Sequence, residues 1–236
     1  MKIEIWSDVM CPFCYIGKRR FEKALAQFPN KDQIQVEWKS FQLDPSLQGV
    51  VSKEAYFAKK GFPAGQLEAM NANMQAMALA EGLEMNMDKT IIANTYKAHQ
   101  LLQLAKSLGK GNESEEVLFE MYFTEGYNLD EDATIYEAAK RLAIAQELVA
   151  DALQNNTQQA AFEKDLIEAQ QFGISGVPFF ILDRKYAVSG AQSPEHFFGA
   201  LTQSFNEWQE NQPAPIVVIN DVNEGPSCDA SGNCTV

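Results

Sequence analysis

The chain has 236 residues, 46% of them apolar and 11% aromatic, which is enough for a sizeable core and excludes disorder of the whole chain. Its 19 Lys and Arg against 32 Asp and Glu give a formal charge of −13, so the overall field disfavours nucleic acid, phospholipid surfaces and acidic substrates. No apolar run reaches membrane-spanning length, and the start Met1-Lys2 without an apolar leader favours a cytoplasmic location.

The first predicted elements are a short strand and a helix, joined by two closely spaced cysteines. Residues 3–6 alternate apolar and polar side chains, as a β-strand does. Cys11-Pro12-Phe13-Cys14 follows, and Pro12 fits the first position of a helix, where no backbone N–H is needed. Cys11 is therefore expected at a helix N-terminus, where the helix dipole stabilises a thiolate, and is predicted to be the attacking sulfur. Cys14, one turn further on, is placed to resolve the mixed disulfide.

A structural zinc site is the alternative interpretation of the four cysteines. Cys228 and Cys234 would supply the second pair of ligands, but five residues separate them, whereas structural zinc sites typically have about two to four. Pro12 at a helix start also argues against zinc. We therefore predict no metal site and assign Cys11 and Cys14 to thiol-disulfide exchange, since a cytoplasmic CxxC is expected to cycle rather than to persist as a structural disulfide.

A second strand and a long helical block follow. Residues 34–41 alternate like a strand and complete a β-α-β unit, which ends at Asp44-Pro45. After that, helical periodicities replace strand patterns. Helices are predicted over residues 64–81, 90–108, 113–124, 134–143 and 157–172. A block of this size is too large for a connector, so it is predicted to be a helical subdomain inserted into the strand-bearing fold.

Three features of these helices each have two interpretations. The methionines between Met70 and Met87 could form an adaptable surface for partners, but their helical spacing favours core filling. His99 could contact a substrate near the thiols, but a solvated or hydrogen-bonded helix histidine is the simpler expectation. The basic run at residues 18–20 could attract anionic ligands, but a solvated helix flank is the expected role.

Strand patterns return near residue 173. Two glycines and a proline precede the apolar run 179–182, which is followed by a tight turn at Asp183-Arg184 and a strand at residues 186–189, so an antiparallel hairpin is predicted. Ser193-Pro194 begins the last helix as an N-cap followed by a proline. The remaining tail is rich in Pro, Gly, Asn and Asp, with one β-prone run at residues 216–219.

Without the helical block, the order is β-α-β and then β-β-α. This order, with Cys11-Pro12-Phe13-Cys14 after the first strand and Gly176-Val177-Pro178 before the third, resembles the thioredoxin fold. A helical block at this point resembles the DsbA-like branch, and residues 6–17 and 174–180 resemble the cytoplasmic FrnE-like subgroup most. The resemblance extends to about residue 210 of the chain.

The resemblance implies an α/β thioredoxin fold with a large all-helical insertion between its two halves. Residues 1–48 and 173–210 would form a discontinuous thioredoxin-like domain. Residues 49–172 would form the inserted helical subdomain, and residues 211–236 a C-terminal tail that carries the second cysteine pair.

The resemblance also implies a thiol-disulfide oxidoreductase that acts on disulfide-containing proteins or peptides, without a metal or organic cofactor. In that family the proline is cis and packs against the nucleophilic cysteine, so Pro178 would lie beside Cys11. The backbone of Val177 would then pair with an extended substrate, and Pro12 and Phe13 complete the expected substrate-binding set. Without the resemblance, an ordinary trans proline that ends a loop is the expectation. Periplasmic members have Pro-His between the cysteines, so Pro-Phe here does not imply a strongly oxidising potential.

Two points stay open. The same fold branch includes kappa-class glutathione transferases and hydroxychromene carboxylate isomerases, which use a serine at the first thiol position; Cys11 with a resolving Cys14 favours redox cycling instead. Glutathione is a candidate co-substrate, and glutathione or a thioredoxin-type protein a candidate reductant. Cys228 and Cys234 can pair, and they are predicted either as an accessory redox relay or as incidental tail thiols.

Overall fold

The computed structural model describes residues 1–63 and 65–211, with the backbone of residues 227–228 and 234–235. The first half of the fold consists of β1 (Lys2–Ser7), α1 (Pro12–Gln27), a short 3₁₀ turn (Lys31–Gln33) and β2 (Gln35–Ser40). The second half consists of β3 (Phe179–Leu182), β4 (Tyr186–Ser189) and α9 (Pro194–Glu210). The segment between them consists of α2 (Lys53–Lys59), α3 (Leu67–Ala80), α4 (Tyr96–Ser107), α5 (Gly111–Phe119), a π-helix (Glu120–Glu125), α6 (Asp132–Arg141), α7 (Gln146–Asn155) and α8 (Gln159–Gln171). The predicted β-α-β and β-β-α halves with an all-helical insertion are therefore confirmed.

The main sheet has the strand order β2-β1-β3-β4. β1 is parallel to β2 and antiparallel to β3, so Ile5 lies between Trp38 and Phe180 on the neighbouring strands. β3 and β4 form the predicted hairpin. Asp183 and Arg184 are the central residues of its turn, which is closed by the N–H of Lys185 donating to the carbonyl of Leu182, and both have left-handed backbones, with φ angles of 51° and 52°.

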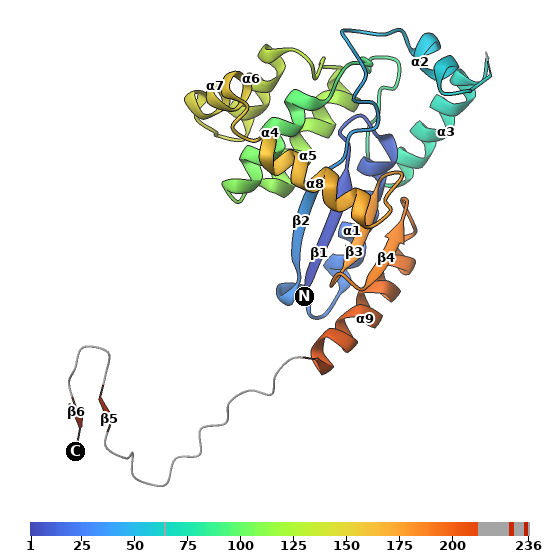
Figure 1. Ribbon diagram of the computed structural model, residues 1–236. Helices are drawn as coiled ribbons and strands as arrows, with labels where there is room; N and C mark the ends of the chain where they lie inside the picture. Colours follow the sequence, from blue (N-terminus) through green and yellow to red (C-terminus); the bar gives the residue numbers. More distant parts are fainter. Residues whose placement is uncertain (64, 212–226, 229–233, 236) are drawn as a thin grey trace.

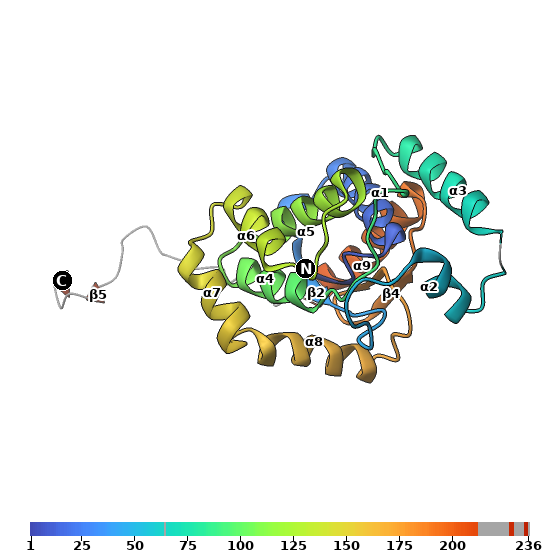
Figure 2. The same cartoon turned by 90° about the horizontal axis from the view of Figure 1, so that it is seen from above.

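The two faces of β1 pack against different helices. Ile3 and Ile5 are fully buried in the core beneath α1 and α9. Trp6, on the opposite face, is fully buried against α8, where its Nε1 donates to the carbonyl of Asp165 at 2.9 Å. Figure 1 shows α8 crossing the sheet, with α2 and α3 grouped at one side of the molecule and α6 and α7 at the other; Figure 2 shows the same separation from above. The inserted helices therefore cover one face of the sheet and extend beyond it.

The helical insertion differs from its prediction at three elements. α2 and α7 were not predicted, because each is short and buries very few side chains: Tyr56 in α2, and Val149 and Ala152 in α7. The helix predicted from residue 90 begins at Tyr96, since Ile92 is held in an antiparallel bridge to the segment before α2.

The tail is described only in part. The backbones of β5 (Ser227–Cys228) and β6 (Cys234–Thr235) pair antiparallel, with Cys228 opposite Cys234. The β-prone run predicted at residues 216–219 lies outside the described residues.

Candidate active site

Cys11 and Cys14 occupy the start of α1, as predicted. Cys11 is the N-cap residue, with extended backbone angles, and Pro12 takes the first helical position. The N–H of Cys11 donates to the carbonyl of Asp8 at 2.9 Å, and the N–H of Cys14 donates to the carbonyl of Cys11 at 3.0 Å. Both thiols are free; Cys11 is 5% exposed and Cys14 is fully buried. Only the first sulfur is therefore within reach of a ligand.

The loop before β3 closes over this helix start. The Val177-Pro178 peptide bond is cis, as the family resemblance implied, and the carbonyl of Val177 accepts from the Cys11 thiol at 3.5 Å. Gly17, which the sequence analysis did not single out, is what lets the loop approach α1. A Cβ atom at Gly17 would lie 3.0 Å from Pro178 Cγ and 3.4 Å from Ala191 Cβ.

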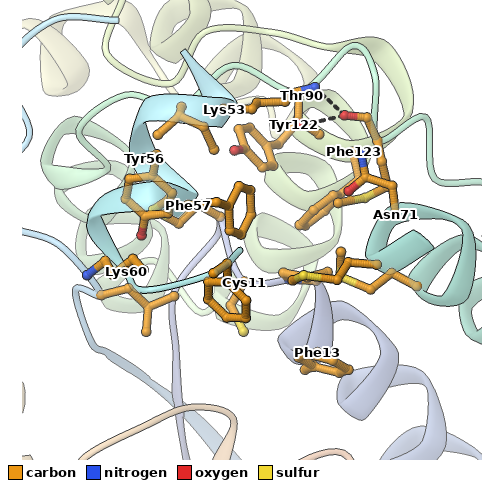
Figure 3. Close-up of a pocket in the computed structure, with 18 of the residues that line it drawn as sticks. Cys11, Phe13, Lys53, Tyr56, Phe57, Lys60, Asn71, Thr90, Tyr122 and Phe123 are labelled. Atoms are coloured by element: carbon orange, nitrogen blue, oxygen red, sulfur yellow. Dashed lines mark hydrogen bonds between the residues drawn. The ribbon is translucent and has the colours of Figure 1, made fainter. Parts of the chain in front are cut away.

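A cavity of about 460 Å³ opens above Cys11 (Figure 3). Figure 3 shows Lys53, Tyr56 and Phe57 of α2 on one side, with Lys60 directly after that helix, and Cys11 and Phe13 on the other. The lining residues come from the CxxC segment, α2, α3, the π-helix, the loop before β3, and the connections after β2, after α2 and between α3 and α4: Met10, Cys11, Pro12, Phe13, Leu43, Lys53, Tyr56, Phe57, Lys60, Phe62, Met70, Asn71, Met74, Met87, Thr90, Ile92, Tyr122, Phe123, Gly176 and Val177. Of the predicted substrate-binding residues, Pro12, Phe13 and Val177 are among them, and Pro178 is not.

Two of the methionines are buried, as core filling predicts, and also line the cavity; the partner surface considered for them stays a prediction. These two are Met74 and Met87, which line the cavity above Cys11 together with Met70 and Met10. Helical spacing could not separate these roles, because a side chain that faces a cavity inside the fold follows the same period as one that fills a core. The thioether side chains give this wall a soft and adaptable apolar surface.

The π-helix supplies two aromatic side chains to the same wall. Tyr122 and Phe123 are both buried and both line the cavity, and burial raises the pKa of Tyr122. Isolated π-turns of this kind are frequent at functional sites. No sequence signal marked this segment, since its periodicity reads as an ordinary helix.

A buried polar cluster lies next to Cys14. We call Ser7, Asp8, His99 and Glu115 this polar cluster; each is at most 2% exposed. Ser7 Oγ donates to Glu115 Oε2 at 3.4 Å, and Asp8 Oδ2 accepts from the N–H of Leu43 at 2.7 Å. His99 Nε2 lies 3.4 Å from Asp8 Oδ1, but without hydrogen-bond geometry.

Burial dominates the protonation of this region. It raises the pKa of Cys14 well above its ordinary value, and the adjacent Cys11 sulfur raises it further, while hydrogen bonds from the Asp8 backbone and the Ser7 side chain act in the opposite direction. Burial also raises the pKa of Glu115 to about 8, against the attraction of Lys18; the carboxylate of Asp8 adds to the increase. Glu115 is therefore mostly protonated at neutral pH, unlike an exposed carboxylate.

Two expectations of solvated side chains were wrong. His99 is fully buried, because α4 is covered on every side over residues 98–105. Lys18 is 1% exposed rather than part of a solvated flank. Its Nζ lies 2.6 Å from both Glu22 and Glu116, since α5 packs against this side of α1.

The described residues contain no group of three or more His, Cys, Asp and Glu arranged to hold a metal ion. Over the same residues, no helix combines the length and apolar character needed to cross a membrane. The side chains of Cys228 and Cys234 lie outside the described part of the chain, so their predicted pairing stays a prediction.

Residues 2–202 match the family of DSBA-like thioredoxin domains. The chain belongs to this family. Its fold is therefore the thioredoxin-like DsbA fold, and it is an enzyme of the DsbA-like disulfide oxidoreductase type.

Three relatives place the chain within the family. The crystal structure of a probable DsbA oxidoreductase, SCO1869 from Streptomyces coelicolor, is 36% identical with a TM-score of 0.84, and the match covers 100% of this chain and 99% of that one. The uncharacterized protein YwbO of Bacillus subtilis (strain 168) is 27% identical over 212 residues, 85% of this chain and 95% of YwbO. The cytosolic disulfide reductase DsbM of Pseudomonas aeruginosa shares the fold at 14% identity and a TM-score of 0.63, over 88% of this chain and 100% of DsbM.

Proposed function

We propose that the chain catalyses thiol-disulfide exchange, with Cys11 as the attacking thiolate and Cys14 as the resolving thiol. Cys11 attacks one sulfur of a substrate disulfide, forms a mixed disulfide and releases the other substrate sulfur as a thiolate. Cys14, once deprotonated, attacks the Cys11 sulfur and releases the second substrate thiolate. The substrate gains two electrons, the CxxC pair loses two, and the cysteine protons pass to the released thiolates. The steps run in either direction.

One observation carries this assignment: two free thiols lie one turn apart at the start of α1, and only Cys11 opens into the cavity. A helix N-terminus favours negative charge on the first sulfur. Complete burial and a raised pKa keep Cys14 protonated until Cys11 is in a mixed disulfide, which suits the later step.

The expected partners follow from the chemistry. Sulfur exchange uses no metal or organic cofactor, so the proposal needs only a disulfide substrate in a protein or peptide and a thiol that restores the reduced pair. Glutathione or a thioredoxin-type protein would supply that thiol. A cytoplasmic location fits this cycle, and the fold relative DsbM of Pseudomonas aeruginosa is described as cytosolic.

Replacing Cys14 tests the proposal. Cys14→Ser should accumulate a mixed disulfide between Cys11 and a disulfide-containing peptide, seen as a mass increase of one peptide thiol by non-reducing mass spectrometry. Cys11→Ser should form none, and the wild type should pass through the adduct without accumulating it. An enzyme that uses Cys11 only to orient glutathione, as the isomerase alternative requires, would keep its activity in Cys14→Ser and trap nothing. That result would contradict the proposal.

The tail pair acts in this proposal as an accessory redox relay. Cys228 and Cys234 are opposite each other in the β5-β6 ladder, and opposite residues of an antiparallel pair have Cα atoms about 4.5 to 5.5 Å apart, within disulfide range. A tethered dithiol reaches an effective concentration near the millimolar range at the CxxC pair.

A chain that ends at Glu224 tests the relay, with Cys228→Ser and Cys234→Ser in the full-length chain as the matched control. Both should slow reduction of the oxidised CxxC pair by the same factor with at least one reductant. Full rates with glutathione and with a thioredoxin-type reductant would remove the relay from the mechanism.

A further inference from the structure

The cavity above Cys11 has the chemistry of a small-molecule site. Its volume of about 460 Å³ lies within the usual range of about 300 to 1,000 Å³ for ligand pockets. Methionine and aromatic side chains form most of its wall, and polar groups are few. Such a wall offers little to replace the hydration of a peptide-like ligand, so it favours an apolar group beside the reacting sulfur.

The charged side chains that line the cavity are all of one sign. Among the described residues that line it, two are lysines, Lys53 and Lys60, and none is Asp or Glu. This contrasts with the formal charge of −13 for the whole chain. The charged groups that a ligand would meet in the cavity wall are therefore basic, although the protein as a whole is acidic.

The two lysines differ in their pairing. Lys60 Nζ already lies 3.3 Å from Asp44 Oδ2 and stacks over the Tyr56 ring. Lys53 Nζ has no carboxylate within ion-pair distance in the described part of the chain, and donates instead to the carbonyl oxygens of Met87 and Asp88 (Figure 3 draws the contact with Met87). The carboxylates of Asp88 and Glu54 act on Lys53 only from beyond ion-pair distance, so its half-buried ammonium can still pair directly with a ligand carboxylate.

The cavity also limits what can reach the sulfur. Cys11 is 5% exposed and lies opposite α2, whose side chains Tyr56 and Phe57 face it across the cavity (Figure 3). Phe13 and Phe62, each 42% exposed, are the most exposed of the aromatic side chains that line it. A sulfur this little exposed, at the base of a cavity of about 460 Å³, favours a disulfide small enough to enter the cavity.

We infer that the cavity selects low-molecular-weight disulfides whose arm combines an apolar, preferably aromatic, body with a carboxylate that pairs with Lys53. This inference rests on the proposed exchange chemistry and names its substrate class. The arm lies against Met70, Met74 and Phe57, and its sulfur is the one that Cys11 attacks. The second arm leaves as a thiolate, and Cys14 then releases the bound arm as a thiolate while the Cys11-Cys14 disulfide forms. Oxidised glutathione, with polar amides in place of an apolar body, is a poor substrate by this criterion.

Binding is measured first with a probe that cannot exchange. Isothermal titration calorimetry of the reduced protein with 4-(methylthio)benzoate should give tighter binding than with 4-(methylthio)benzamide, which differs only in the charged group. Lys53→Met should weaken binding of the benzoate by about tenfold, the scale of one charge-assisted hydrogen bond, and leave the benzamide unchanged. Lys59→Met is the matched control, because Lys59 is on the same helix but does not line the cavity. Equal affinities for the two probes would overturn the carboxylate assignment.

The apolar wall is tested by a second pair of variants on α3. Met70→Gln keeps the side-chain length but makes a half-buried lining residue polar, and should weaken both probes by severalfold. Met77→Gln makes the same change at a half-buried position outside the cavity and should weaken neither. Equal effects of the two variants would mean that the probes do not occupy this cavity.

Exchange rates complete the test. The reduced protein should be oxidised by 4,4′-dithiodibenzoate faster than by 4,4′-dithiobis(benzamide), and faster than by oxidised glutathione, after each rate is divided by the uncatalysed rate with dithiothreitol. Exchange with all three disulfides at equal normalised rates would overturn the substrate class and leave the proposed function intact. Tight binding of the benzoate probe without exchange of any disulfide would instead contradict the proposed function.

Discussion

The two sulfurs of the CxxC pair lie three residues apart in sequence but face different surroundings. Cys11 opens into a cavity of methionine and aromatic side chains, whereas Cys14 is sealed against Ser7 and the polar cluster that includes Asp8 and Glu115. The insertion supplies most of the first environment and half of the second: α2, α3 and the π-helix contribute to the cavity wall, and α4 and α5 carry two of the four members of the polar cluster. The thioredoxin-like half thus positions the two sulfurs. The inserted helices contribute side chains to the surroundings of each sulfur, the cavity at Cys11 and the polar cluster at Cys14.

The largest difference between Cys11 and Cys14 should appear in their rates of alkylation. In the reduced protein, iodoacetamide should label Cys11 faster than Cys14 by on the order of a hundredfold or more at neutral pH, because Cys14 is fully buried and its pKa is raised. Peptide mapping by mass spectrometry measures both rates, in a background of Cys228→Ser and Cys234→Ser so that only two thiols report. The rates should converge in denaturant, and equal rates in the folded protein would contradict the comparison.

The polar cluster should make the free energy of unfolding depend on pH, through Glu115. The pKa of Glu115 is about 8 in the folded protein and near 4.5 when it is unfolded, so between these values only the folded state keeps the proton. Stability therefore falls as pH rises through this window, by at most about 1.4 kcal/mol per pH unit, and levels off above the folded pKa. Glu115→Gln removes this loss, because the amide does not titrate.

Urea unfolding of both proteins measures this effect. Between about pH 5 and about pH 8 the wild type should lose roughly 2 to 4 kcal/mol relative to Glu115→Gln. Glu113→Gln is the matched control, since Glu113 lies on the same helix and is exposed. Parallel stability curves for wild type and Glu115→Gln would mean that Glu115 is ionised in the folded protein.

Local sequence patterns were sufficient for the thioredoxin-like half. The alternation at residues 3–6, Pro12 at a helix start and Ser193-Pro194 at another are short-range signals, and the structure confirms β1, α1 and α9 close to the predicted bounds. α2 has an N-cap signal in Ser52, whose side chain accepts from the N–H of Ala55, but its seven residues bury only Tyr56 and so give no apolar periodicity. The element that forms the roof of the cavity was therefore the one that periodicity could not detect.

The residues of the candidate site also fall into two groups, those that a local sequence pattern predicts and those that depend on contacts between distant elements. Spacing alone was enough to predict that Cys11 and Cys14 lie at one helix start, which the structure confirms, and to propose them as a redox pair. The burial of Lys18 depends on Glu116, which lies 98 residues further along the chain, and the polar cluster joins β1 to α4 and α5. Contacts of this range are set by how elements pack, and no pattern within one element reports them. Gly17 was missed for this reason too, because its neighbour Pro178 comes from a distant loop.

The smallest expected effect concerns that contact, and a pair of glycines isolates it. Gly17 in α1 and Gly199 in α9 are both helical, but a Cβ atom at Gly199 meets nothing within 4 Å, whereas one at Gly17 lies 3.0 Å from Pro178 Cγ. Gly199→Ala should stabilise the protein by about 0.5 to 1 kcal/mol through helix propensity alone. Gly17→Ala has the same gain in helix propensity, but the rigid proline ring has to move, at a cost of about 1 to 3 kcal/mol. Urea unfolding should therefore show a free energy of unfolding about 1 kcal/mol lower than that of the wild type. Because the displaced loop also carries the Val177 carbonyl that contacts Cys11, exchange should slow severalfold in Gly17→Ala and stay unchanged in Gly199→Ala. If both variants gain the same stability and keep the wild-type exchange rate, the approach of the loop to α1 is not what holds Cys11 in place.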